Sequence, residues 1–188
     1  MDPQDFDIRP LTLQDAPAWR ALRLKALKDH PTAFLASYEE TSVQTVEEMA
    51  GRIPAPGSPD VIFGLFAGGR LVGSAGFFQA QGLKVRHKGG MWGVYVHPDA
   101  RGRGGAGALV AAVIAHARGC VEVLQAAVLT TNAAARTVYL RAGFRSMGFE
   151  RRCMRIDGVY YDDELLWLPL DEEPGSLPKP GLSDRRAP

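Results

Sequence analysis

Residues 94–110 read Val94-Tyr95-Val96-His97-Pro98-Asp99-Ala100-Arg101-Gly102-Arg103-Gly104-Gly105-Ala106-Gly107-Ala108-Leu109-Val110. An apolar strand leads into a loop of glycines and arginines, and this loop opens into an apolar helix. Glycines let the backbone approach a bulky anion, and the first N–H groups of a helix have no partner within it. Those donors and the positive end of the helix dipole favour a phosphate. The stretch therefore predicts a site for a phosphorylated ligand, with Arg101 and Arg103 adding positive charge.

The composition is that of an ordinary globular domain. The chain has 188 residues, of which 46% are hydrophobic and 23% charged, so we expect one domain with a substantial core. The net charge of +1 gives no support for a nucleic-acid partner or an acidic membrane surface. Cys120 and Cys153 have no metal-ligand spacing, and no metal site is expected. Neither a secretory leader nor a membrane span is visible, which predicts a cytoplasmic location.

Apolar periodicity and turn residues predict a mixed α/β domain over residues 1–170. Helices are expected after a first capping residue at Thr12, after the capping box of Thr45 and Glu48, after the glycine loop and at 132–142. Residues 34–41 read as a loop, and residues 171–188 as a Pro/Gly-rich tail. The expected strands lie at 7–11, 61–66, 71–78, 91–96, 121–128, 144–156 and 161–170.

The glycine loop has other interpretations. The segment from Gly102 to Gly107 also fits the dinucleotide fingerprint G-x-G-x-x-G, and Glu122 lies about twenty residues further on, where that fold places a ribose-binding acid. An NAD(P)-dependent oxidoreductase is therefore an alternative. Against it, residues 97–101 separate the strand from the first glycine, and the chain lacks a second run of βαβ units. A phosphate-binding P-loop is excluded because no Lys-Ser or Lys-Thr follows the glycines.

A second motif supports a third interpretation. The loop matches the pattern [Gln/Arg]-x-x-Gly-x-[Gly/Ala], and residues 132–144, Asn132-Ala133-Ala134-Ala135-Arg136-Thr137-Val138-Tyr139-Leu140-Arg141-Ala142-Gly143-Phe144, match N-x-x-A-x-x-x-Y-x-x-x-G-F. In this order, with one strand between them, the two motifs resemble the GNAT superfamily of N-acetyltransferases. The resemblance covers roughly residues 7–170. It implies a mixed, mostly antiparallel central sheet flanked by helices, with a V-shaped opening between strands 91–96 and 121–128 that binds coenzyme A.

The resemblance implies acetyl-CoA as the cosubstrate and a primary amine as the acceptor, which attacks directly in a ternary complex. Backbone groups of Val94 and Val96 would pair with the pantetheine arm, and a backbone N–H near Val96 would hold the thioester oxygen. A non-catalytic module that binds coenzyme A stays open as a further alternative. The implied cofactor-binding residues are Val94, Tyr95, Val96, Arg101, Gly102, Arg103, Gly104, Gly105, Ala106, Gly107, Ala108, Asn132, Ala135 and Arg136.

Tyr139 is the residue to which the resemblance gives the role of acid. Asn132 and Tyr139 are two helical turns apart and share a face, so both can reach one ligand. A phenol has a pKa of about 10 and a thiol about 8.5, so Tyr139 is protonated at neutral pH and available to the departing thiolate. A helical tyrosine by itself is more often a half-buried core residue.

The acceptor side lacks an evident general base. An alkylamine with a pKa of about 10.4 lies roughly 4–5 kcal/mol from its reactive neutral form at pH 7. Many relatives place a glutamate on the strand before the glycine loop, but residues 91–95 contain no carboxylate. Glu39, Glu40, His97 and the cluster Asp162-Asp163-Glu164 are candidates, although each also fits an ordinary surface position.

The acceptor itself is not encoded in any recognisable motif. In the family that this chain resembles, the equivalents of the loop at 34–41 and of the final hairpin usually wall the acceptor site. Tyr38, Trp92, Tyr160 and Tyr161 are therefore candidates for an aromatic pocket, with Glu39 and Glu40 beside it. Dimers are common among such proteins, and the sequence leaves a homodimer open.

Overall fold

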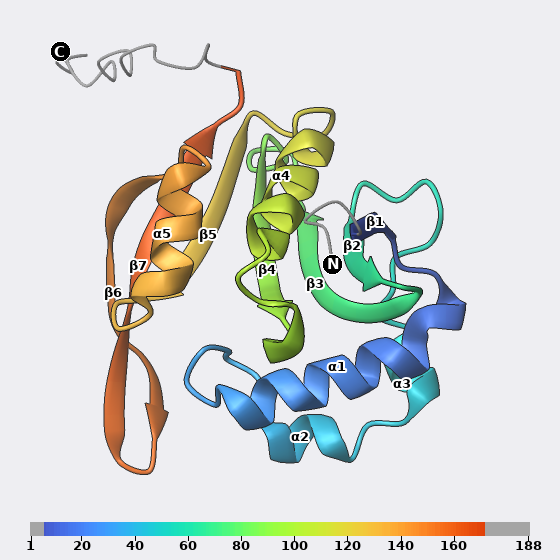
Figure 1. Cartoon of the computed structure of the whole chain (residues 1–188). Helices are drawn as coiled ribbons and strands as arrows, with labels where there is room; N and C mark the ends of the chain where they lie inside the picture. The colour runs from blue at the N-terminus through green and yellow to red at the C-terminus, as the bar shows by residue number, and fades with distance from the viewer. Residues whose placement is uncertain (1–5, 172–188) are drawn as a thin grey trace, which may run out of the picture.

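One sheet of seven strands, in the order β1-β2-β3-β4-β5-β7-β6, carries helices on both faces (Figure 1). The structure is a computed structural model and describes residues 6–171. The expected tail at 171–188 lies outside the described residues except for Asp171. The elements along the chain are β1 (Phe6–Pro10), η1 (Leu13–Asp15), α1 (Ala16–Asp29), α2 (Tyr38–Ser42), α3 (Val46–Ala50), β2 (Val61–Ala67), β3 (Arg70–Gln79), β4 (Lys88–Val96), η2 (Pro98–Ala100), α4 (Gly105–Ala117), β5 (Val123–Leu129), α5 (Ala133–Arg141), β6 (Arg145–Ile156) and β7 (Val159–Pro169).

The sheet opens between β4 and β5. These two strands are parallel and pair only where residues 88–90 face residues 123–125, whereas the other neighbouring strands in the described chain pair antiparallel. Beyond this short ladder β4 and β5 diverge (Figure 1). The predicted mixed, mostly antiparallel sheet with a V-shaped opening is confirmed.

A β-bulge shapes β4 beside the opening. Tyr95 pairs with Ser74 and Trp92 pairs with Gly76, so Gly93 and Val94 together oppose the single residue Ala75. Gly93 has φ of 65°, which suits glycine better than any other residue. An extra residue in one strand bends it and increases its twist. The bulge therefore occurs in the part of β4 that no longer pairs with β5.

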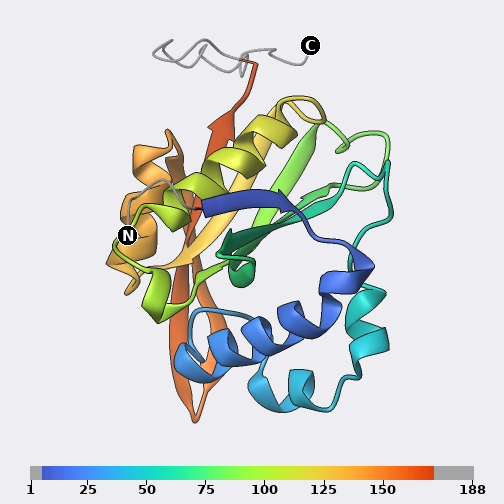
Figure 2. The same ribbon diagram turned by 45° about the vertical axis from the view of Figure 1, so that its right-hand side comes forward.

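Two hydrophobic clusters fix the helices on opposite faces of the sheet, and Figure 2 shows α4 and α1 on these two sides. On one face, Leu109 and Val113 of α4 pack with Leu124 of β5. On the other face, Trp19 and Leu22 of α1 belong to a cluster with residues of α3, β2 and β4. The apolar face expected for α4 comprises Leu109, Val110, Val113, Ile114 and Ala117; all of these are buried except Ile114, which is half-buried.

Most boundaries differ from expectation by one or two residues, and two differences are larger. Within the expected loop at 34–41, the chain forms α2, because Ser37 Oγ accepts a hydrogen bond from the Glu40 N–H (3.1 Å) and the Glu40 carboxylate accepts one from the Ser37 N–H. Strand β4 begins at Lys88 rather than at residue 91. Gly89 and Gly90 look like loop residues in sequence, but a Cβ at either position would lie within 2.5 Å of a phenyl ring of β3. These glycines permit close packing of the rings.

The ring of Trp92 covers Gly76 in the same way, and this contact yields a prediction. A Cβ at Gly76 would stand 2.2 Å from Trp92 Cε2, so Gly76→Ala should destabilise the fold by about 1–3 kcal/mol through overpacking. Urea unfolding measures the loss. Gly51→Ala is the matched control, because Gly51 has a helical φ of −62° and its Cβ would meet Glu48 O at an ordinary 3.5 Å. Equal stabilities for the two variants would contradict the role of the Trp92–Gly76 contact.

Candidate functional site

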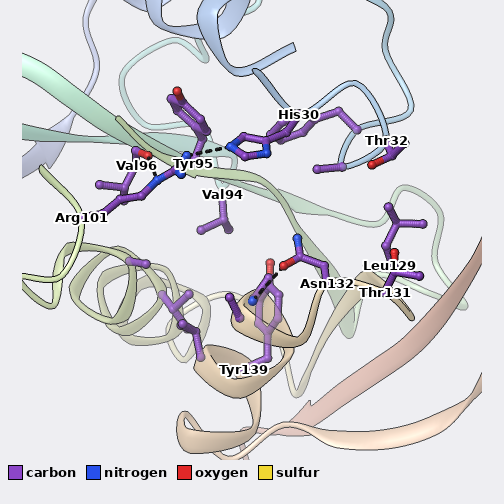
Figure 3. A pocket seen from close by; sticks show the side chains of 17 residues that line it. His30, Thr32, Val94, Tyr95, Val96, Arg101, Leu129, Thr131, Asn132 and Tyr139 are labelled. Atoms are coloured by element: carbon purple, nitrogen blue, oxygen red, sulfur yellow. Dashed lines mark hydrogen bonds between the residues drawn. The ribbon is translucent and has the colours of Figure 1, made fainter. Parts of the chain in front are cut away.

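The opening between β4 and β5 holds a cavity of about 440 Å³. Its walls come from the end of β4, the end of β5, the first turns of α4, helix α5 and the segment that follows α1 (Figure 3). A second cavity of about 790 Å³ lies over the glycine loop and α4. The two share Val96, Arg101, Ala106 and Val138 as lining residues, so they adjoin, and together they are called the cleft below.

The glycine loop presents a row of backbone donors to this cleft. Gly104 caps α4 in the left-handed conformation, with φ of 81° and no side-chain cap. The first N–H with an acceptor is that of Ala108, which donates to Gly104 O; within residues 6–171 the amides of residues 102–107 have none. A Cβ at Gly102, Gly104 or Gly107 would meet nothing within 4 Å. Free amides at an open helix N-terminus are suited to an anion such as a diphosphate.

Gly105 has a different reason to be glycine. It is buried, and a Cβ there would lie 2.7 Å from Leu65 Cδ2 in the core. The residue therefore allows α4 to lie close against β2.

The Arg101 side chain connects the end of β4 to the segment that follows α1. Its Nε donates to Val96 O (2.9 Å), and its Nη2 lies 2.9 Å from His30 Nε2 (Figure 3). Because a guanidinium has no acceptor, His30 Nε2 is the acceptor in this hydrogen bond. The other predicted cation, Arg103, lies 4.6 Å from the centre of the Phe6 ring and lines neither cavity. Ala108 also lies outside both linings.

The end of β4 leaves a backbone amide facing the opening. His97 N–H donates to Val72 O on β3 (2.7 Å). Successive residues of an extended strand direct their N–H groups to opposite sides, so the Val96 N–H points away from β3. The Val96 carbonyl faces the same way and accepts from Arg101. The Val96 amide is thus available at the wall of the cleft.

Tyr139 projects from α5 into the first cavity. Its side chain is only 6% exposed, and its ring packs edge-to-face on Phe144 with 5.4 Å between centroids. The hydroxyl points from α5 toward Val94 across the cavity (Figure 3). Burial raises the pKa of Tyr139 to about 12, so the phenol keeps its proton. Asn132 lines the same cavity and caps α5, with its Oδ1 accepting from the Ala135 N–H at 3.1 Å.

Arg136 does not reach the cleft. Its guanidinium forms a bidentate ion pair with Glu164 of β7, whose side chain is 4% exposed. The hydrogen bonds from Arg136 lower the pKa of Glu164. Glu164 is therefore an ionised partner of Arg136 rather than a group free to accept a proton.

Residues 15–144 match the family model described as the acetyltransferase (GNAT) family. The chain belongs to the GNAT family of acetyltransferases. Members of this family take the acetyl group from acetyl-CoA, which is therefore the cosubstrate. The oxidoreductase alternative is excluded, and the sheet, with one parallel pair among its described strands, is not the parallel sheet of a dinucleotide-binding fold.

Solved structures share the whole fold. A GNAT-family acetyltransferase from Streptococcus pneumoniae is 25% identical with a TM-score of 0.76, the match covering 87% of this chain and 98% of that one. The yncA structure from Salmonella typhimurium is 22% identical, with a TM-score of 0.78 and coverages of 90% and 96%. A GCN5-related N-acetyltransferase from Kribbella flavida is 21% identical, with a TM-score of 0.77 and coverages of 89% and 99%. A comparison with curated proteins finds no significant match.

The residues predicted for the acceptor pocket lie outside the two cavities of this GNAT chain. None of Tyr38, Glu39, Glu40, Trp92 and Tyr161 lines either cavity. Instead His30, Thr32 and Phe34, which directly follow α1, form the wall opposite α5 (Figure 3). The sequence signals a helix end at His30-Pro31, but nothing in its periodicity indicates that this end faces the cleft. Arg118 and Arg141 line the second cavity, and no sequence pattern indicates this position for either residue.

Four of the six expected general bases, Glu40, His97, Asp162 and Glu164, have other partners. Asp162 accepts hydrogen bonds from the Arg151 side chain and the Arg152 N–H, and His97 Nδ1 accepts from the Asp99 N–H. Glu40 serves as the capping partner of Ser37. In the described part of the chain no Asp or Glu lines either cavity. Over the same residues, no helix is long and apolar enough to cross a membrane.

The left-handed glycine at the start of α4 yields a test of the cleft. Gly104→Ala should weaken acetyl-CoA binding by about tenfold, which corresponds to about 1.4 kcal/mol, because a Cβ strains this φ and narrows the approach to the free amides. Isothermal titration calorimetry with acetyl-CoA measures the affinity. Gly68→Ala, at φ of 54° in the β2–β3 turn, introduces similar strain away from the cleft and should leave the affinity unchanged. Equal affinities for all three proteins would rule out the amide row as the binding element.

The Arg136–Glu164 pair predicts a pH-dependent stability. The folded-state pKa of Glu164 is lowered, so the pair stabilises the fold above the unfolded pKa of about 4.3 and loses this effect as pH falls through the lower folded-state value. Arg136→Gln should therefore unfold at lower urea concentration than wild type at pH 7, and the difference should shrink toward pH 3. Arg155→Gln, whose guanidinium lies over the Tyr160 ring, should show no such trend. A difference for Arg136→Gln that is constant with pH would refute the pairing.

Proposed function

We propose that this chain transfers the acetyl group of acetyl-CoA to a primary amine by direct attack in a ternary complex. One observation carries the proposal: the free amides at the start of α4 and the side chain of Tyr139 lie at two adjoining cavities that share four wall residues. The similar yncA structure contains acetyl-CoA, which supports the same use of the cleft here. The acceptor amine would approach from the wall formed by His30, Thr32 and Phe34.

In this proposal the backbone binds the cosubstrate. The amides of residues 102–107 hold the diphosphate, because they lack acceptors and begin a helix. The open edge of β4 at Val94 and Val96 pairs with the pantetheine amides as an added strand would. Ala106, Ala134 and Ala135 line the first cavity, and their small side chains leave room for a slim ligand arm between α4 and α5.

The chemical step needs a donor at the oxygen and a donor at the sulfur. The Val96 N–H faces the cleft and can stabilise negative charge on the acetyl oxygen. Tyr139, with its pKa raised to about 12, remains protonated and donates a hydrogen bond, then a proton, as the sulfur departs. The acceptor nitrogen forms the new C–N bond, the C–S bond breaks, and the nitrogen releases one proton to solvent. Solvent then returns a proton to the Tyr139 phenolate.

Deprotonation of the acceptor is left to solvent. No carboxylate among the described residues lines the cleft, and His30 already accepts from Arg101 through Nε2. With an alkylamine as acceptor, kcat/KM should therefore rise about tenfold per pH unit below the amine pKa of about 10.4. This profile follows from the fraction of neutral amine.

Tyr139→Phe tests the proposal directly. We expect the variant to release free thiol from acetyl-CoA about a hundredfold more slowly in the presence of a reactive amine, with acetyl-CoA affinity retained. A thiol-reactive dye reports turnover and calorimetry reports binding. Thr137→Val is the matched control, because Thr137 is an exposed residue of the same helix whose hydroxyl donates only to Ala133 O.

Two outcomes would overturn parts of the proposal. A wild-type rate in Tyr139→Phe would show that another group assists the leaving sulfur. Binding of acetyl-CoA without turnover by wild type, across a panel of alkylamines, amino acids and peptides, would support the non-catalytic alternative.

A further inference from the structure

Arg23 of α1 lies beside Phe34, which lines the first cavity, although Arg23 itself is not among the lining residues of either cavity. Its guanidinium carbon is 4.9 Å from the centre of the Phe34 ring and 5.9 Å from that of Trp92. Its Nη1 is 3.4 Å from the position that a Cβ on Gly93 would take. Phe34 lines the first cavity, and Gly93 belongs to the bulge beside Val94, which also lines it. The guanidinium therefore sits beside two elements of the cavity wall.

This cation has no polar partner in the described chain. Across residues 6–171 Arg23 makes neither an ion pair nor a hydrogen bond, and its contacts are the two aromatic rings. Arg20, one turn earlier on α1, donates instead to Gln44 O and Ser42 O at 2.8 and 2.7 Å. Among the described residues, Gln44 Oε1 is the one solvent-inaccessible side-chain polar atom without a hydrogen-bond partner. The Arg23 nitrogens also lack a partner but are not among such inaccessible atoms, so they keep access to solvent or to a ligand.

The electrostatic surroundings of Arg23 are positive. Burial, and to a smaller extent the neighbouring cation Arg52, lower the pKa of Arg23 to about 10. The guanidinium is still charged at neutral pH. Removing a charge from water without a counter-charge is unfavourable, and contact with aromatic faces offsets only part of this cost. A negatively charged group on a ligand would supply the missing counter-charge for Arg23.

The geometry also favours one shape of anion. Aromatic rings beside a guanidinium limit its rotation and leave its N–H edge for hydrogen bonding. A planar carboxylate matches two parallel N–H donors. A lysine at this position would hold a point charge without that directional fork.

We propose that Arg23 binds a carboxylate of the acceptor, so that the amine acetylated by this chain carries a carboxylate group. This inference rests on the proposed function, because it concerns the second substrate of the same site. Arg23 is a specificity-determining residue in this account. It takes no part in the step in which the amine nitrogen gains the acetyl group and the coenzyme A thiol leaves.

Matched pairs of acceptors test the inference. The twenty standard L-amino acids and their C-terminal amides are each incubated with wild-type protein and acetyl-CoA, and thiol release gives kcat and KM. For the amino acids that react, we expect kcat/KM to exceed that of the matched amide by at least about tenfold, mainly through KM, since one charged hydrogen-bonded contact is of this size. Arg23→Gln should abolish the preference, and Arg23→Lys should retain part of it.

Controls separate this contact from a structural role. Lys28→Gln removes the same charge from an exposed position on the same helix and should keep the acid-over-amide preference. Thermal unfolding shows that each variant is folded, and acetyl-CoA affinity should be the same in all of them. A purely structural Arg23 would lower the melting temperature in Arg23→Gln but leave the ratio between acid and amide unchanged, which would overturn the inference.

The remaining outcomes distinguish the two proposals. Acids and amides that react equally well with wild type, or acetylation of alkylamines alone, would refute carboxylate recognition while leaving acetyl transfer intact. Failure of every amine to release thiol, despite bound acetyl-CoA, would refute the proposed function itself.

Discussion

The site depends on the early end of the ladder between β4 and β5. Once residues 88–90 have paired with residues 123–125, the two strands diverge and the backbone of β4 loses its neighbour. Unpaired backbone groups need partners. Arg101 satisfies the Val96 carbonyl, and the adjacent amide is left for a ligand. The divergence thus creates both the space of the cleft and the donors that line it.

The same divergence brings two distant motifs together. The glycine loop continues from the end of β4, and α5 starts just after the end of β5. Because β4 and β5 run parallel, their carboxyl ends meet at one edge of the sheet. The amides at the start of α4 and the phenol of Tyr139 therefore open onto one cleft, although they are more than thirty residues apart in sequence.

Charge is distributed unequally around this cleft. Arg101, Arg118 and Arg141 line it, whereas no described carboxylate does. Glu164 and Asp162 are held by arginines of α5 and β6. This arrangement suits the polyanion acetyl-CoA and explains why a general base is missing from the wall. In the proposed reaction the acceptor's proton passes to solvent, and an anionic group on the acceptor would bind beside Arg23.

The sequence predicted the features that depend on residues close together in the chain. These are the glycine-rich start of α4, the Asn132 cap of α5 and the Thr45–Glu48 capping box. Ser37 and Glu40 form a capping box of the same pattern, so the sequence also contains the signal for α2, within the segment that was expected to be a loop. Tertiary structure alone decided which charges are used. Arg136 contacts Glu164, Arg101 contacts His30, and Arg23 contacts no acid within residues 6–171. Packing between remote elements selects these partners, and no spacing along the chain encodes that choice.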